Sequence, residues 1–113
     1  PLARGRLART WETSTGRSET DVFGSGLYGR DVTQQSDRDV VSAVAEIAAN
    51  RGTSMARVAL AWVLSNPTVT APIVGATRAS HLDDAVAALD IGLSGDELER
   101  LTSPYIPHQP AGF

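Results

Sequence analysis

Hydrophobic residues recur at helical spacing through most of the chain beyond residue 36. Ser36 can cap a first helix, with Asp39 at the third helical position. Asn50-Arg51-Gly52 is typical of a helix end, because glycine readily adopts the left-handed conformation that follows a last turn. The pattern therefore predicts a helix between these two points, and its apolar positions are Val40, Val41, Val44, Ile47 and Ala48.

A second helix is predicted to begin near Thr53-Ser54 and to stop at Asn66-Pro67, since proline does not continue a helix. Its run from Val58 to Leu64 is apolar on nearly every side, so we expect it to be deeply packed. The two helices have the spacing of a DNA-binding helix-turn-helix around Gly52. However, the second helix offers Arg57 alone to read bases, and the chain has a net charge of -3. Packing of two core helices is the better interpretation, and we expect no nucleic-acid partner.

The second half of the chain predicts one strand and two more helices. Residues 69–74 are rich in β-branched side chains and predict a short strand, although Pro72 cannot donate to a sheet ladder. Ser94 and Glu97 form a capping box at the start of the last helix. The helix before it has an apolar face marked by Leu82, Val86 and Leu89. One strand cannot form a sheet by itself, so this order predicts the end of a larger α/β fold.

The composition narrows the class of protein. With 42% hydrophobic and 20% charged residues the chain reads as soluble and globular, and we expect a cytoplasmic protein without a membrane partner. The absence of Cys excludes disulfides and thiolate metal sites. All ten basic residues are Arg, so chemistry that needs a lysine is not complete within these 113 residues. Pro1-Leu2-Ala3-Arg4 has neither an initiator Met nor a secretory apolar core, which leads us to expect a piece of a longer protein.

Two glycine-containing segments are candidates for nucleotide binding. Residues 24–29, Gly-Ser-Gly-Leu-Tyr-Gly, match the G-x-G-x-x-G pattern, but they neither follow a buried strand nor open a helix, so a flexible loop is the better interpretation. Gly75-Ala76-Thr77-Arg78, in contrast, joins the predicted strand to a helix. Glycine allows a close approach of backbone and ligand, the helix start offers free amides, and Arg78 suits a phosphate. Capping alone would also explain these residues, so phosphate binding is permitted without being required.

The chain resembles the C-terminal part of aldo-keto reductases, particularly bacterial members and their potassium-channel β-subunit relatives. The resemblance rests on residues 57–64, 69–77 and 82–86, and on the lead at residues 1–7. It implies an α/β fold in which residues 1–113 form the C-terminal part of a (β/α)8 TIM barrel: the end of strand 7, strand 8, and the flanking and closing helices. It also implies NADP as the cofactor and the reduction of an aldehyde or ketone to an alcohol.

By the same resemblance, the cofactor residues fall in two loops and one helix. Pro1, Leu2, Ala3, Arg4 and Gly5 match the loop along the pyrophosphate, and Gly75, Ala76, Thr77 and Arg78 match the loop that holds the adenosine 2′-phosphate. His81 falls near that phosphate, and Asp84 where an acidic residue contacts adenine. Two positions depart from the pattern: Ala85 replaces a common adenine-contacting Asn, and Thr10 stands where channel relatives have a cofactor-binding Lys.

The family's catalytic Tyr, Lys, Asp and His lie on earlier strands, so the resemblance implies no catalytic residue here and an inactive isolated chain. Tyr105 and His108 are expected in a tail that wraps the surface. Residues 10–36 match a long loop that in the family can fold over cofactor and substrate; Trp11, Phe23 and Tyr28 could line a pocket there or pack the loop down. An alternative function is a non-catalytic nucleotide-sensing or interaction protein of the channel β-subunit type.

Overall fold

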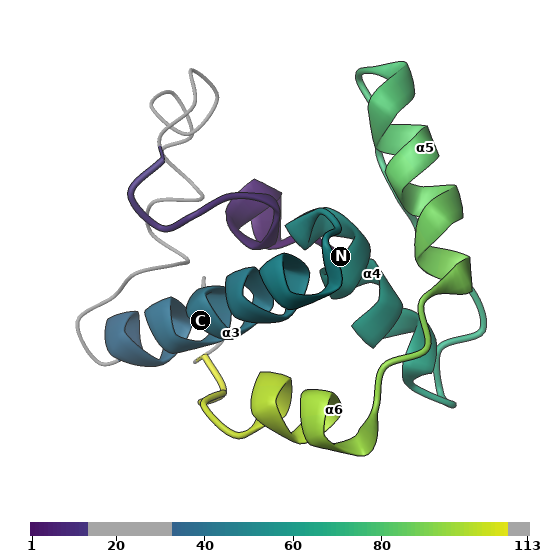
Figure 1. Cartoon of the computed structure of the whole chain (residues 1–113). Coiled ribbons are helices and arrows are strands. Elements are labelled where there is room, and N and C mark those ends of the chain that lie inside the picture. Colours follow the sequence, from purple (N-terminus) through teal and green to yellow (C-terminus); the bar gives the residue numbers. More distant parts are fainter. Residues whose placement is uncertain (14–32, 109–113) are drawn as a thin grey trace.

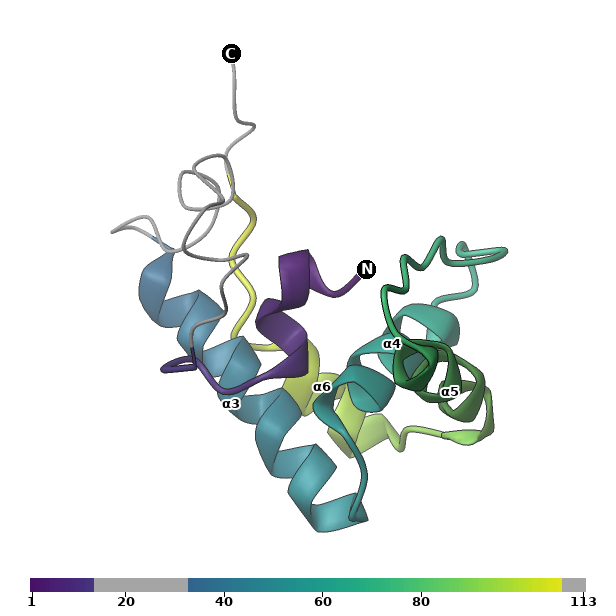
Figure 2. The same ribbon diagram turned by 90° about the horizontal axis from the view of Figure 1, so that it is seen from above.

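The computed structural model describes residues 1–13 and 33–108. Within these residues the helices α3 and α4 cross at the centre (Figure 1). The N-terminal turn, which contains the 3-10 helix η1, lies on one side of this pair, and α6 lies on the other side. The helix α5 stands beside α4 (Figure 2). The elements in chain order are the 3-10 helix η1 (Ala3–Ala8), α3 (Gln34–Arg51), α4 (Met55–Ser65), α5 (Ala79–Ala87), the 3-10 helix η2 (Ala88–Asp90) and α6 (Gly95–Thr102).

The core lies where α3, α4 and α6 meet. Small alanines alternate with branched side chains on the facing surfaces, which lets the helix axes approach closely. Leu2 and Leu7 of the N-terminal turn, partly buried, pack against this cluster. The predicted burial of α4 is confirmed for its first half, but Trp62 is 38% exposed and its indole N–H donates to the Thr102 hydroxyl at 3.3 Å. The buried cluster consists of Ala43, Val44, Ile47, Ala48, Val58, Ala59 and Leu101.

Three predicted helix ends are confirmed. Gly52 follows α3 in the left-handed conformation (φ 62°, ψ 37°). The Ser54 hydroxyl caps α4 by accepting a hydrogen bond from the Arg57 N–H. Both hydrogen bonds of the capping box between Ser94 and Glu97 are present at the start of α6. These ends are recognisable from sequence because each depends on residues at most four positions apart.

The predicted cap at Ser36 is wrong. The helix α3 begins at Gln34, with Thr33 as its N-cap, so Ser36 lies inside the first turn and is buried. Its hydroxyl donates to the Pro104 carbonyl at 2.6 Å and accepts from the Ile106 N–H at 3.0 Å. The hydroxyl that was predicted to cap the helix is therefore hydrogen-bonded to the tail that follows α6.

The predicted strand at residues 69–74 does not form, and no strand is present in residues 1–13 and 33–108. A strand needs a neighbour to satisfy its backbone groups, and these ranges offer none. The helix α5 forms as predicted, but its apolar face is uncovered: Leu82 is 54% exposed and Val86 65%. The described residues contain helices but neither strand 7 nor strand 8, so the C-terminal part of a barrel stays a prediction.

A bidentate ion pair joins the end of α3 to the start of α6. Arg51 Nε donates to Glu97 Oε1 at 2.7 Å and Arg51 Nη2 to Glu97 Oε2 at 2.6 Å. Arg51 Nη2 also donates to the Gly92 carbonyl at 2.7 Å. The hydrogen bond from Arg51, together with the one from the Ser94 backbone N–H, lowers the pKa of Glu97 to about 2. Both bonds favour the ionised carboxylate.

We expect the stabilisation from this carboxylate to be lost in acid. A group whose pKa is lowered by folding stabilises the fold above its unfolded pKa, near 4.5, and loses that effect as pH falls through about 2. Glu97→Gln keeps an acceptor for the Ser94 N–H and removes only the charge. The Glu97→Gln chain should therefore be less stable than the unaltered chain at pH 7, and the difference should shrink between pH 4.5 and 2. Urea unfolding at a series of pH values measures it. Glu99→Gln on the same helix is the control, and an equal pH dependence in both variants would contradict the assignment.

Candidate cofactor-binding loops

The N-terminal loop curls into a left-handed turn. Ala3 (φ 47°), Arg4 (φ 56°) and Gly5 (φ 86°) all have positive φ. The Leu2 carbonyl accepts hydrogen bonds from the Gly5 N–H at 2.9 Å and the Leu7 N–H at 3.3 Å, which closes the turn. Positive φ at two residues other than glycine is strained backbone, a feature that clusters at binding sites. These are three of the five residues that the resemblance places along the pyrophosphate.

Arg9 braces this turn from inside the loop. Its Nη1 donates to the Gly5 carbonyl at 2.9 Å and its Nε to the Thr13 carbonyl at 2.9 Å. Burial, and secondarily the charge of Arg6, lowers the pKa of Arg9 from its usual value. Arg9 is next to Thr10, which replaces the cofactor-binding Lys of the channel relatives. In this structure the Arg9 guanidinium holds the loop together through its hydrogen bonds to the Gly5 and Thr13 carbonyls.

The second loop presents an open helix start. Residues 75–78 are all exposed, and Arg78 is the N-cap of α5 with an extended backbone and no side-chain capping bond. The first N–H groups of a helix have no partner within it and carry a partial positive charge. The Thr77 N–H donates to His81 Nδ1 at 3.4 Å, so the imidazole lies over the same turn. A hydroxyl, a guanidinium, an imidazole and free amides are thus gathered at one exposed site.

Asp84 is held by a partner that sequence reasoning did not identify. Arg57 Nε of α4 lies 2.7 Å from Asp84 Oδ1 of α5, with the two side chains 37% and 25% exposed. The residues are 27 positions apart, so no local pattern pairs them. A signal was nevertheless present, because Arg57 is the single charged residue of α4 and a lone charge on an apolar helix is commonly paired.

The elements that adjoin the two predicted loops, η1 and α5, both pack against α4. The N-terminal turn packs on α3 and α4, and α5 packs on α4 and η2. In Figure 2 the N-terminus lies on the side of α4 that faces the chain leading into α5. The elements η1 and α5, which come from opposite parts of the sequence, therefore pack against the same helix.

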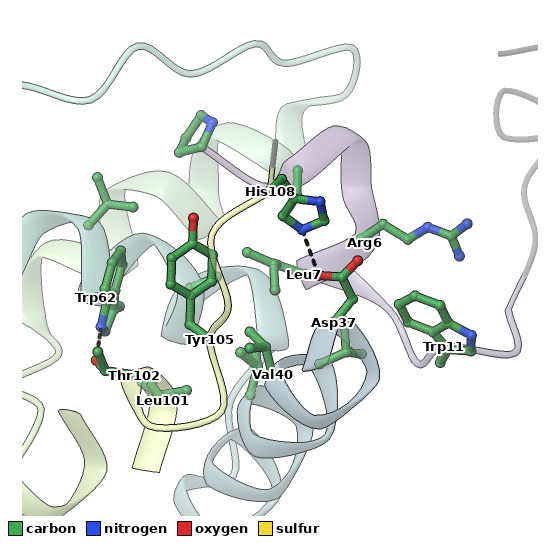
Figure 3. Close-up of a pocket in the computed structure, with 16 residues that line it drawn as sticks. Arg6, Leu7, Trp11, Asp37, Val40, Trp62, Leu101, Thr102, Tyr105 and His108 are labelled. Atoms are coloured by element: carbon green, nitrogen blue, oxygen red, sulfur yellow. Dashed lines mark hydrogen bonds and ion pairs between the residues drawn. The ribbon is translucent and has the colours of Figure 1, made fainter. Parts of the chain in front are cut away.

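A cavity of about 520 Å³ opens among η1, α3, α4, α6 and the tail, and Pro1 and Ala3 of the predicted pyrophosphate loop are among the residues that line it. Its lining is mostly apolar, and the aromatic rings of Trp11, Trp62 and Tyr105 surround it (Figure 3). His108 Nε2 lies 2.8 Å from Asp37 Oδ1 of α3 at its rim. The predicted tail is thus seen to run along α3, but Tyr105 and His108 line this cavity, which the sequence did not indicate.

Several predictions fall outside the described residues. The G-x-G-x-x-G segment at residues 24–29 and the aromatic residues Phe23 and Tyr28 lie in residues 14–32. Trp11 is described, and the guanidinium groups of Arg6 and Arg38 lie 4.9 Å and 5.3 Å from the centre of its ring. Trp11 therefore lines the cavity, with two cations near its ring.

The sequence matches the aldo/keto reductase family over residues 1–106, and the chain belongs to this family. It is 42% identical to versiconal hemiacetal acetate reductase of Aspergillus parasiticus over 108 residues, covering 95% of this chain and 31% of that protein. It is also 42% identical to an aldo-keto reductase of Metarhizium robertsii over 114 residues (99% and 30%), and 34% identical to one of Alternaria alternata over 113 residues (99% and 29%). The chain thus spans about a third of the length of these relatives. They are fungal, and the expected closeness to bacterial and channel members is not shown.

Two negative observations apply to residues 1–13 and 33–108. No helix in them is long and apolar enough to cross a membrane. They also contain no group of three or more His, Cys, Asp or Glu side chains arranged to hold a metal ion.

Proposed function

We propose that this chain is the cofactor-binding C-terminal part of a cytoplasmic, NADP(H)-dependent aldo/keto reductase that reduces an aldehyde or ketone to an alcohol. The observation that carries the proposal is the exposed first turn of α5, where Thr77, Arg78 and His81 surround uncapped amides. In a member of this family, such a turn fits a phosphate monoester better than an uncharged group, because every donor on it favours an anion.

Each part of the cofactor has residues that suit it. Arg78 would bind the 2′-phosphate through its planar guanidinium, Thr77 would donate its hydroxyl, and His81 would contact the same group. The backbone of residues 1–5 would lie along the pyrophosphate, and Asp84 would accept from the adenine amino group. The bound cofactor supplies the hydride. Residues 1–113 would hold it without reacting with the carbonyl compound, because the lysine of the family's catalytic set is absent from all 113 residues.

Binding of adenosine 2′,5′-bisphosphate to the purified chain tests this proposal. Calorimetry should show tighter binding of this ligand than of adenosine 5′-phosphate, which lacks the 2′-phosphate. Arg78→Ala should weaken binding of the bisphosphate by about tenfold, the scale of one charge-assisted contact to phosphate. Arg100→Ala is the matched control, since Arg100 pairs with Glu46 at 2.9 Å on α3, away from α5.

Two results would contradict the proposal. Equal affinity for both ligands would show that α5 does not recognise the 2′-phosphate. Turnover of NADPH with an aldehyde by the 113-residue chain would refute its inactivity. The alternative of a non-catalytic nucleotide-sensing protein has less support, because the relatives reported above are named as reductases.

A further inference from the structure

The helix α5 is held in place by very little burial. None of its nine residues is buried, and Leu82 and Val86 expose more than half of their surface. Its first turn nevertheless carries the side chains proposed to bind the 2′-phosphate. Because little nonpolar burial restrains its rotation and tilt, directed contacts contribute more to its orientation.

The ion pair between Arg57 and Asp84 is the directed contact available. Among the described residues, no other side chain of α5 has a hydrogen bond or ion pair to another helix. Arg57 lies in the first turn of α4, and its neighbours Ala56 and Val58 are buried in the core. A cation beside the buried core thus holds a carboxylate on a helix that has no buried residue.

We propose that Arg57 is a positioning residue for the adenosine end of the cofactor. It holds Asp84 through Oδ1 and thereby fixes the orientation of α5, so that the first turn faces the 2′-phosphate. Asp84 Oδ2, which has no hydrogen bond among the described residues, stays available as an acceptor for the adenine amino group. Arg78 and Asp84 are six residues apart, or about 9 Å along a helix, so one pairing controls both contacts. This inference rests on the proposed function.

A paired ligand titration tests the inference. Replacing Arg57 by methionine keeps the aliphatic stem and removes the charge, while replacing it by lysine keeps a cation that can reach the carboxylate. We expect Arg57→Met to weaken binding of adenosine 2′,5′-bisphosphate roughly fivefold, which is the most that a partly exposed ion pair supplies. Arg57→Lys should recover most of the affinity. The affinity for adenosine 5′-phosphate should fall less, because its single phosphate does not contact the first turn of α5.

Two further measurements separate positioning from a general loss of stability. Amide hydrogen exchange without ligand should be faster across residues 79–87 in Arg57→Met and unchanged across α3. In an Asp84→Asn background, Arg57→Met should have little further effect on binding of the bisphosphate, because the two residues act as one unit.

The outcomes distinguish this inference from the proposed function. If the unaltered chain binds neither ligand, both the proposed function and the positioning role of Arg57 are wrong. If the unaltered chain prefers the bisphosphate and Arg57→Met binds it equally well, only the positioning role is overturned. If Arg57→Met weakens both ligands by the same factor, Arg57 contributes only to stability and the inference is wrong.

Discussion

Replacing Ile47 by alanine is expected to lower the free energy of unfolding by about 2–5 kcal/mol, the usual range for removing a large aliphatic side chain from a core. Ile47 is 4% exposed and belongs to the cluster that joins α3 to α4 and α6. Truncation removes buried methylene and methyl groups and leaves a space that the crossed helices cannot fill without moving. Since small domains have only about 5–15 kcal/mol of stability in total, this loss would be severe. Urea unfolding followed by circular dichroism measures it.

The chain provides a matched control in Ile73. This side chain is 91% exposed, so Ile73→Ala makes the same chemical change without opening a cavity. We expect its effect to stay within about 0.5 kcal/mol, as for other exposed positions. Similar losses for the two variants would mean that Ile47 is not in a packed core, and would contradict the arrangement of α3, α4 and α6.

Replacing Gly5 by alanine is expected to cost about 2 kcal/mol, because a side chain at positive φ is strained by about 1–2 kcal/mol and a neighbour must also move. Gly5 has φ 86°, and an added Cβ would lie 2.6 Å from Arg9 Nη1. Arg9 can swing away only by giving up its bonds to the Gly5 and Thr13 carbonyls. The N-terminal turn would then lose its brace. The change in unfolding free energy is measured in urea as above.

Two other glycines allow the effect of backbone strain to be separated from that of the contact with Arg9. Gly52 has φ 62° with open space around it, so Gly52→Ala tests the backbone strain alone and should cost about 1 kcal/mol. Gly75 has neither a positive φ nor a close neighbour, and Gly75→Ala should have almost no effect on stability. An effect of Gly5→Ala no larger than that of Gly75→Ala would contradict the left-handed turn at residues 3–5.

The sequence was sufficient wherever a short pattern determines the structure. The left-handed Gly52 and the capping box of Ser94 and Glu97 were predicted correctly, because their hydrogen bonds close within one turn. The existence of α5 was also predicted correctly from the spacing of Leu82 and Val86. The same spacing did not reveal that this face is exposed in the described residues, since a periodic pattern marks an apolar face without showing what covers it.

Other features depend on residues far apart in the chain. Ser36 looked like a helix cap, yet its partners lie 68 and 70 positions away. Arg57 and Asp84 each had a plausible separate interpretation, and their pairing required the tertiary structure. The strand at residues 69–74 needed neighbours that residues 1–13 and 33–108 do not contain. For the candidate site, family resemblance supplied the residue roles, while the structure supplied the open helix start and the contacts behind it.

The buried hydroxyl of Ser36 determines the register of the tail. It has a single proton, which it gives to the Pro104 carbonyl, and it receives the N–H of Ile106. A slip of the tail by one residue would offer Ser36 either the N–H of Tyr105, which is already given to the Thr102 carbonyl at 3.0 Å, or Pro107, which has no N–H. The side chains that reach the cavity, Tyr105 and His108, are therefore selected by one oxygen atom in the first turn of α3.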